Sequence, residues 1–276
     1  MSKFSVTFDL WDTLISDQAG DDRKRREVRC NGMINVLASF GFRVSRERFL
    51  AAYDGSSAWL QATWQTHREI ATPDQAKRIA AEAVGVLPDD AELMQCLDEA
   101  YVAPVLDIPP RLKDEVVETL QGMRERVAKI GLICNIGRSS GRVLRKLLQN
   151  LQVLDFFNAT IFSDEVGIRK PDRRIFENAA ESLGVEISSI VHVGDHSEAD
   201  VWGAKQAGMR ALLLELPPEL FEGRDLASLW RSTKQVSNSE IKPDGRIKSL
   251  KQALAYVDRM LAESGPTDTI PGKITN

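Results

Sequence analysis

Residues 8–15 read FDLWDTLI, and this stretch decides the fold. Before it, apolar residues from Phe4 to Phe8 are interrupted only by Ser5 and Thr7, which predicts a buried strand that ends just before Asp9. Ligands of open α/β sheets bind at the carboxyl ends of the strands, so we expect Asp9 to lie where chemistry is done. A carboxylate at such a place can attack phosphorus or carbon and form an acyl-type intermediate.

Length and composition limit the class of protein. A chain of 276 residues suits one large domain or a core with an inserted subdomain. A net charge of -4 gives no reason to expect nucleic acid or an anionic membrane as a partner. The cysteines Cys30, Cys96 and Cys134 show no C-x-x-C spacing, which is typical of a reducing compartment. With no signal segment and no apolar run near the roughly 20 residues that cross a bilayer, we expect a soluble, cytoplasmic protein.

Residues 16–105 have the pattern of a helical block. Apolar residues recur at helix spacing in Asp21–Phe40, Ser45–Ile70, Pro73–Val84 and Asp89–Val102. Thr72-Pro73 is typical of a helix start, and Gly41 and Gly85 of helix ends. No strand is evident in this block, so we predict an all-helical cap subdomain.

Beyond residue 106 the pattern alternates between helices and strands. The predicted strands are Ile130–Cys134, Thr160–Phe162, Ile190–Val193 and Arg210–Leu214. The predicted helices are Leu112–Val127, Gly141–Leu148, Asp172–Leu183, Ala199–Ala207 and Ile247–Leu261, with a turn-rich segment at 216–242. This alternation predicts an α/β fold, a doubly wound parallel sheet with a Rossmann-like core. We therefore assign 1–15 and 106–263 to the core, 16–105 to the cap and 264–276 to a loose tail.

Four segments at the ends of predicted strands carry polar groups in a fixed order. They are Asp9-Leu10-Trp11-Asp12-Thr13, Ile133-Cys134-Asn135, Gly167-Ile168-Arg169-Lys170-Pro171-Asp172 and Gly194-Asp195-His196-Ser197-Glu198-Ala199-Asp200. In this order they resemble the haloacid dehalogenase superfamily of phosphatases, phosphotransferases and dehalogenases. The resemblance covers 3–15 and roughly 108–214, and the helical block lies where that family inserts its cap.

The resemblance implies a role for each segment. Asp9 is the expected nucleophile, with Thr13 as a hydrogen-bonding support of its loop. A phosphate ester would repel an attacking carboxylate unless cations offset its charge. Lys170 is the first expected cation, since its ammonium group is a compact point charge.

The second expected cation is Mg²⁺. It prefers carboxylate and carbonyl oxygens together with water. Asp9, Asp195, Asp200 and the backbone carbonyl of Trp11 form the expected ligand set, in which Asp200 binds directly or through water.

Trp11 is the main departure from the family pattern. Hydrolytic phosphatases of the family usually have a second Asp two residues after the nucleophile, and general acid–base help of this kind is worth about 10²–10⁴-fold. Asp12 follows one place later, but neighbouring residues leaving a strand tend to point to opposite sides. We expect Asp12, a cap residue or the substrate to supply the proton. Dehalogenases of the family carry an aromatic residue here, which makes them the natural rival.

Cys134 is the second departure, because it stands where the family has Ser or Thr. A thiol is a weaker hydrogen-bond donor than a hydroxyl group, which predicts looser phosphate binding. Asn135 and backbone N–H groups at the next helix start are expected to cradle phosphate oxygens. Arg138 either reaches a second anionic group of the substrate or is a solvated loop residue, and the sequence leaves both open.

Other polar and aromatic residues carry a weaker signal. Helical spacing favours Trp59, Trp64, His67 and Arg68 as cap core and surface over pocket lining. For the run Arg23-Lys24-Arg25-Arg26, a solvated helix face balanced by Asp21 and Asp22 is favoured over a grip on a substrate anion. His192 is expected to be packed within its strand, whereas His196 lies in the metal-binding segment.

The sequence thus predicts a Mg²⁺-dependent hydrolase that acts on a small phosphate monoester, such as a phosphorylated metabolite, through an aspartyl-phosphate. The alternatives are a 2-haloacid dehalogenase that forms an aspartyl ester, and a weakly active or inactive relative with a binding or regulatory role. The sequence does not indicate an oligomeric state.

Overall fold

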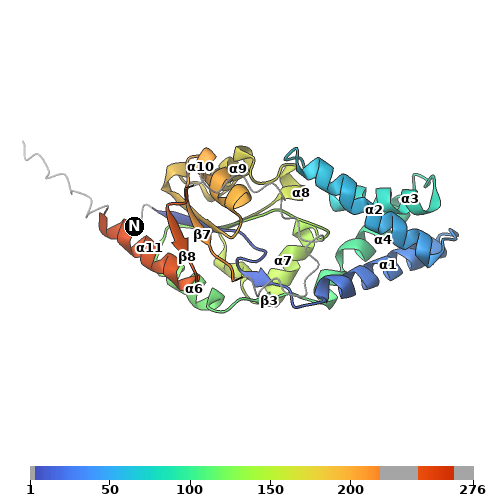
Figure 1. The fold of residues 1–276 in the computed structure, drawn as a ribbon, viewed down its shortest axis with the longest axis horizontal. Coiled ribbons are helices and arrows are strands. Elements are labelled where there is room, and N and C mark those ends of the chain that lie inside the picture. Colours follow the sequence, from blue (N-terminus) through green and yellow to red (C-terminus); the bar gives the residue numbers. More distant parts are fainter. Residues whose placement is uncertain (1–3, 218–241, 264–276) are drawn as a thin grey trace, which may run out of the picture.

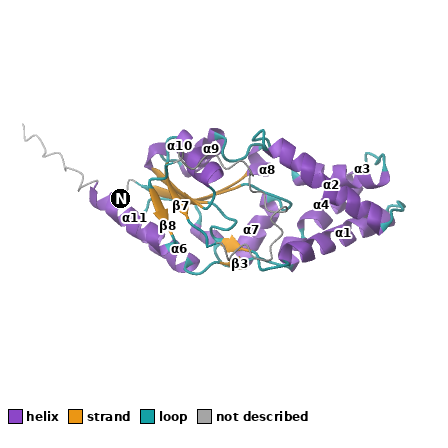
Figure 2. Cartoon of the chain, viewed as in Figure 1, coloured by secondary structure: helices purple, strands orange, loops and turns teal. Residues whose placement is uncertain are grey.

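The computed structural model describes residues 4–217 and 242–263. An α/β core and a helical part lie side by side along the longest axis of the molecule (Figure 1). The two are also distinct in secondary structure, because the described strands all belong to the core or to its junction with the helical part (Figure 2).

The core is built on a six-stranded sheet in which every pairing is parallel. Its strands are β1 (Ser5–Phe8), β4 (Ile130–Cys134), β5 (Ala159–Phe162), β6 (Ile190–Gly194), β7 (Arg210–Leu214) and β8 (Gly245–Ile247), in the order β5-β4-β1-β6-β7-β8. Strand order reverses at β1, where Phe8 pairs with Leu132 on one side and Val193 on the other. The doubly wound parallel sheet is therefore confirmed, and its switch point lies at Asp9.

Helices cover both faces of this sheet. The described helices of the core are α6 (Val116–Arg126), α7 (Gly141–Asn150), α8 (Ser163–Val166), α9 (Arg173–Leu183), α10 (Gly203–Gln206) and α11 (Lys251–Glu263), with short turns at Leu154–Phe156, Ile187–Ser189 and Ser197–Trp202. Side chains of α6, α7 and α11 join one apolar cluster, and those of α9 and α10 join the other. Leu132 and Ile133 enter opposite clusters, as the alternation of a strand requires.

The helical part consists of α1 (Asp21–Ser39), α2 (Arg46–Trp64), α3 (Thr72–Val84) and α4 (Ala91–Val102), followed by the short α5 (Pro104–Asp107). The side chain of Asp90 accepts hydrogen bonds from the first turn of α4, and Gly85 at φ 93° ends α3. β2 (Ile15–Ser16) pairs antiparallel with β3 (Arg111–Leu112). This pair holds together the two segments in which the chain passes between core and cap. The inserted cap is confirmed, whereas its bounds at 16 and 105 stay a prediction. No described helix is both long and apolar enough to span a membrane.

Several predicted elements have different ends. The helix predicted over Ser45–Ile70 ends at Trp64, because the next residues turn away to pair with the core. The helix predicted from Leu112 starts at Val116, since Leu112 pairs with Ile15. The helix predicted over Ile247–Leu261 starts at Lys251, and Ile247 instead extends β8 beside Leu214. Most of the predicted turn-rich segment and the predicted tail lie outside the described residues.

Candidate active site

The side chain of Lys170 contacts β4 and the segments that follow β1 and β6. Its Nζ donates to Asp9 Oδ1 at 2.6 Å, to Asp200 Oδ1 at 2.6 Å and to the carbonyl oxygen of Ile133 at 2.8 Å. Asp9 follows β1 directly, and its own N–H donates to the Val193 carbonyl oxygen at 2.9 Å. The expected meeting of nucleophile and lysine is therefore present in the geometry.

Asn135 holds the backbone of that lysine. Its Oδ1 accepts from the N–H of Lys170 at 2.8 Å, and its Nδ2 donates to the Lys170 carbonyl oxygen at 2.9 Å. These two bonds fix the loop that brings Lys170 to Asp9. A direct contact of Asn135 with a phosphate group stays a prediction.

Asp200 is buried and has several hydrogen-bond donors. Besides Lys170, it faces the Nε2 of His192 at 3.2 Å and accepts from the N–H of His196 at 2.9 Å. It lies on a π-helical turn, Ser197–Trp202, a form that often occurs at functional sites. His192 is packed as predicted: it is fully buried, and its Nδ1 lies 2.9 Å from the hydroxyl of Thr7.

The buried charges shift one another's pKa values. Burial raises the pKa of Asp9 to about 7, with Lys170 opposing the shift and Asp200 adding to it. Burial would raise the pKa of Asp200 as well, but Lys170 and His192 hold it below its ordinary value. Burial would lower the pKa of Lys170, yet Asp200 and Asp9 raise it, so the lysine stays charged. Burial lowers the pKa of His192, with the contact to Asp200 opposing the shift.

Asp195 completes a carboxylate cluster that suits a divalent ion. One oxygen each of Asp9, Asp195 and Asp200 lies within 4.8 Å of the others. In their ionised forms these three groups outweigh the single charge of Lys170 by two negative charges. A hard divalent cation prefers such oxygen ligands and would offset that excess. The residues therefore fit the expected Mg²⁺, while the carbonyl of Trp11 as a ligand stays a prediction.

The loop after Asp9 turns sharply at Asp12. This residue has φ 61°, a left-handed conformation that costs most residues energy but that Asp tolerates better than most. Its N–H donates to the Ile15 carbonyl oxygen at 2.7 Å, and its carbonyl oxygen accepts from Lys113 Nζ at 2.6 Å. Because of this turn, both Trp11 and Asp12 line the same cavity as Asp9.

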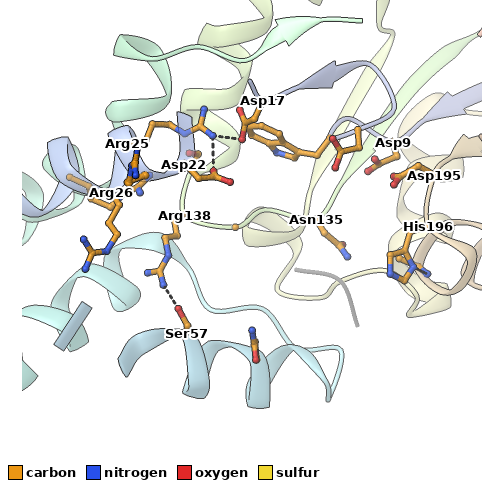
Figure 3. A pocket seen from close by; sticks show the side chains of 18 of the residues that line it. Asp9, Asp17, Asp22, Arg25, Arg26, Ser57, Asn135, Arg138, Asp195 and His196 are labelled. Carbon is orange, nitrogen blue, oxygen red and sulfur yellow. Dashed lines mark hydrogen bonds and ion pairs between the residues drawn. The ribbon is translucent and has the colours of Figure 1, made fainter. Parts of the chain in front are cut away.

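A cavity of about 1180 Å³ opens above these groups, between core and cap. Of the predicted site residues, the structure brings together on its wall Asp9, Trp11, Asp12, Asn135, Arg138, Lys170, Asp195 and Asp200. Figure 3 shows Asp9, Asp195 and His196 on one side and Arg25, Arg26 and Arg138 on the other. The carboxylates of Asp17 and Asp22 lie beside Arg25, so the arginine end of the cavity contains acidic groups as well.

Two predicted residues do not line the cavity. Cys134 is fully buried, its Sγ lies 3.4 Å from the Asn135 carbonyl oxygen, and burial raises the pKa of its thiol well above the ordinary value. The thiol therefore does not face the cavity as the predicted looser phosphate donor would. The buried hydroxyl of Thr13 has no hydrogen-bond partner among the described residues, so the predicted support of the loop by this hydroxyl is not seen.

The cap contributes cavity residues that the sequence did not single out. They include Asp17, Arg29, Tyr53, Ser57 and Gln61. The favoured interpretation of the run Arg23–Arg26 as a solvated face was wrong for Arg25, which is buried and lines the cavity. Arg23 and Lys24 are exposed, and Lys24 pairs with Asp21, as that interpretation expected. Arg23 and the half-buried Arg26 also border the cavity. The favoured assignment of Trp59, Trp64, His67 and Arg68 to cap core and surface agrees with the cavity wall, which includes none of them.

Arg25 shows how one cap arginine enters the wall. Its guanidinium pairs with Asp17, donates to Asp22 at 2.8 Å and lies 5.8 Å from the centre of the Trp11 ring. Burial raises the pKa of Asp17 to about 6, with Arg25 opposing the shift. The block of charged residues at the start of α1 gave no sequence signal that Arg25 faces inward.

Comparison with known proteins agrees with this geometry. The model of the haloacid dehalogenase-like hydrolase family matches residues 5–208. The chain belongs to this family. The match extends from β1 through the cap to Gly208, beyond Asp200, so it includes every carboxylate of the cluster.

Two relatives of this family member are named as a phosphatase and a nucleotidase. Glyceraldehyde 3-phosphate phosphatase of Methanopyrus kandleri is 35% identical over 112 residues, 40% of this chain and 42% of that protein. Pyrimidine 5'-nucleotidase YjjG of Escherichia coli is 35% identical over 114 residues, 41% of this chain and 48% of that protein. The chain thus spans less than half the length of either relative.

A solved dehalogenase shares the whole fold. The 2-haloacid dehalogenase of Pseudomonas syringae has a TM-score of 0.61 at 25% identity, over 94% of this chain and 100% of that one. The haloacid dehalogenase fold therefore extends through both core and cap.

Proposed function

We propose that this hydrolase is a Mg²⁺-dependent phosphatase of small phosphate monoesters. The observation that carries the proposal is the contact of Asp9 with Lys170 in a carboxylate cluster whose excess of negative charge suits a divalent ion. Relatives named as a glyceraldehyde 3-phosphate phosphatase and a pyrimidine 5'-nucleotidase support the same chemistry.

In the proposed reaction, a carboxylate oxygen of Asp9 attacks the phosphorus of the ester. The bond from phosphorus to the leaving oxygen breaks, and the leaving oxygen takes a proton from Asp12, which shares the cavity wall with Asp9. Water then gives a proton to the Asp12 carboxylate as its oxygen attacks phosphorus. The bond from phosphorus to the Asp9 oxygen breaks, which releases inorganic phosphate and restores Asp9 and Asp12. Lys170 offsets the negative charge on Asp9 and the phosphate through both steps.

Asp9, Asp195 and Asp200 would hold the Mg²⁺ ion. When bound, it supplies positive charge that stabilises the phosphoryl oxygens in the transition state. Asn135 fixes the position of the loop that carries Lys170, and the cap excludes bulk solvent from the cavity.

The experiment is turnover of p-nitrophenyl phosphate with and without Mg²⁺. We expect hydrolysis that EDTA stops and Mg²⁺ restores. A folded protein that binds Mg²⁺ and hydrolyses no phosphate ester across a broad panel would instead favour the binding or regulatory role.

Trp11 and the dehalogenase of the same fold favour a second candidate, the hydrolysis of 2-halo acids. Expulsion of halide needs no proton, which suits an aromatic residue at this position. In that reaction Asp9 attacks carbon, and water then attacks the carbonyl carbon of the aspartyl ester. Halide release that continues in EDTA would transfer the assignment to this activity.

A further inference from the structure

Arg29 of α1 is a buried cation in the cavity wall whose hydrogen bonds go to uncharged oxygens. Its side chain donates from Nε to the Tyr101 carbonyl oxygen at 2.6 Å and from Nη1 to the Tyr53 hydroxyl at 3.0 Å. The residue is 4% exposed. Among residues 4–217 and 242–263, no carboxylate makes an ion pair with it.

The arginines beside it are different. Arg25 pairs with Asp17 and Asp22, and Arg26 pairs with Asp54 at 2.6 Å. The cap therefore neutralises these two cations internally. Taking a cation out of water costs several kcal/mol unless an opposite charge or a full set of hydrogen bonds replaces the water. The two hydrogen bonds of Arg29 and the Tyr101 ring, whose centre lies 5.3 Å from its guanidinium, supply no full negative charge, so an anion in the cavity would complete its surroundings.

Arg138 reaches the same place from the core. Its Nη1 donates to the Tyr101 hydroxyl at 2.9 Å, and its guanidinium lies 4.3 Å from the centre of the Tyr53 ring. Its Nη2 donates to the hydroxyls of Ser56 and Ser57 at 2.9 and 3.1 Å, and Figure 3 shows the bond to Ser57. Two guanidinium groups, one from the cap and one from the core, are thus oriented by the same two tyrosines.

We propose that Arg29 and Arg138 form a second anion subsite, so that the substrates are phosphate monoesters with another anionic group, a carboxylate or a second phosphate. The proposal rests on the phosphatase function proposed above. The planar guanidinium fork matches the oxygens of both anions. The cavity, about 1180 Å³, also exceeds what one phosphate group needs and leaves room for a connecting carbon chain.

The test uses matched substrates that differ only at the far end. Phosphate monoesters of ω-hydroxy carboxylates of increasing chain length are compared with monoesters of the corresponding alkanediols, which end in a neutral hydroxyl group, and with diol bisphosphates. The measured quantity is the ratio of kcat/KM for the doubly anionic ester to that for its neutral partner. We expect a ratio of about 10 to 100 at one preferred length, the gain from one charge-assisted hydrogen bond. The carboxylate and bisphosphate series show which anion is preferred.

Variants of the two arginines show whether they cause the preference for the doubly anionic ester. Arg138→Gln should bring the ratio close to one, and Arg138→Lys should retain part of it. Arg29→Lys should lower it as well, and thermal unfolding shows whether this buried variant folds. Arg142→Gln is the matched control, because Arg142 joins α7 to Asp98 and Glu99 of the cap at 3.1 Å without lining the cavity. It should keep the wild-type ratio.

Two failures are distinguishable. If p-nitrophenyl phosphate and the neutral esters are hydrolysed but the ratio stays near one at every length, the subsite is refuted and the phosphatase function stands. A ratio that survives Arg138→Gln also refutes the subsite. If no phosphate ester is hydrolysed, the phosphatase function and the subsite are refuted together.

Discussion

Glu69 of the cap and Arg169 of the core form a buried ion pair directly beside Lys170. Their side chains are 1% and 5% exposed. Glu69 also accepts from the indole N–H of Trp64 at 2.6 Å, and Arg169 donates to the Ile136 carbonyl oxygen at 2.7 Å. Two backbone hydrogen bonds accompany the ion pair. The N–H of Glu69 donates to the carbonyl oxygen of Gly167, and the N–H of Arg169 donates to the carbonyl oxygen of His67. The cap is thus joined to the loop that carries Lys170.

Glu69→Gln should destabilise the protein strongly. Glutamine keeps an amide oxygen for the hydrogen bonds but leaves Arg169 as a buried charge without its counter-ion, which typically costs about 3–5 kcal/mol. Urea unfolding measures the change in free energy. Glu82→Gln is the control, because Glu82 pairs with Arg78 on the exposed face of α3 and should cost no more than about 0.5 kcal/mol. Equal stability of the two variants would contradict the structural role of the pair.

Asp9→Asn should stabilise the metal-free protein, and increasingly so as the pH rises. Burial raises the pKa of Asp9 to about 7 in the folded state, against an ordinary value near 4 in the unfolded chain. Between these values the folded state binds the proton that the unfolded chain has released, so the wild type loses stability as the pH rises. Asn does not ionise, so the variant does not lose stability in this way as the pH rises.

Thermal unfolding in EDTA at about pH 5 and about pH 8 checks the difference between the two proteins. Asp17 and Asp164, whose pKa values are raised to about 6 by burial, are present in both proteins and therefore cancel. A difference in Tm that does not grow with pH would contradict a raised pKa of Asp9 in the folded protein.

Trp11→Asp should raise phosphatase kcat if a carboxyl group at this position protonates the leaving oxygen better than Asp12 does. The new carboxyl group would stand in the cavity wall two residues after Asp9. A general acid is worth about 10²–10⁴-fold where none acts, and we expect a gain below this range, because Asp12 already supplies a proton in the proposed reaction. Trp11→Phe is the control and should not gain activity. A fall in kcat for both variants would instead assign Trp11 to substrate binding.

Asp195→Asn should weaken the binding of Mg²⁺ and leave the fold largely intact. The carboxylate of Asp195 lies in the cluster with Asp9 and Asp200, and loss of one of three negative charges lowers affinity for a divalent cation. We expect the Mg²⁺ concentration for half-maximal turnover to rise by about tenfold or more. Asp164→Asn is the control, since Asp164 accepts from the N–H of Gly141 and does not line the cavity. An unchanged Mg²⁺ requirement in Asp195→Asn would exclude this residue as a ligand.

The core of the site was predictable because strand ends fix it. Asp9 and Asp195 each follow a buried strand, and neighbouring parallel strands bring their carboxyl ends to one edge. The inward face of α1 was not predictable, since Arg25 and Arg29 become wall residues only when the cap packs over the core. Ile247 was assigned to a helix because a three-residue strand leaves too little alternation to recognise.

Asp12 shows a different limit. The alternation of side chains along an extended chain argued against its sharing a side with Asp9, but the left-handed turn at φ 61° brings it to the cavity wall. Such a conformation depends on the loop bonds to Ile15 and Lys113. The ion pair of Arg169 could not be predicted from the sequence, because its partner Glu69 lies a hundred residues away in the chain.

The central claim is that Asp9 becomes phosphorylated during turnover, and acid quenching followed by mass spectrometry of the peptides tests it most directly. With a phosphate ester and Mg²⁺, the peptide that contains Asp9 should carry one phosphoryl group, which hydroxylamine removes and which Asp9→Asn lacks. Steady turnover with that peptide unmodified, or with the label retained in Asp9→Asn, would contradict the account.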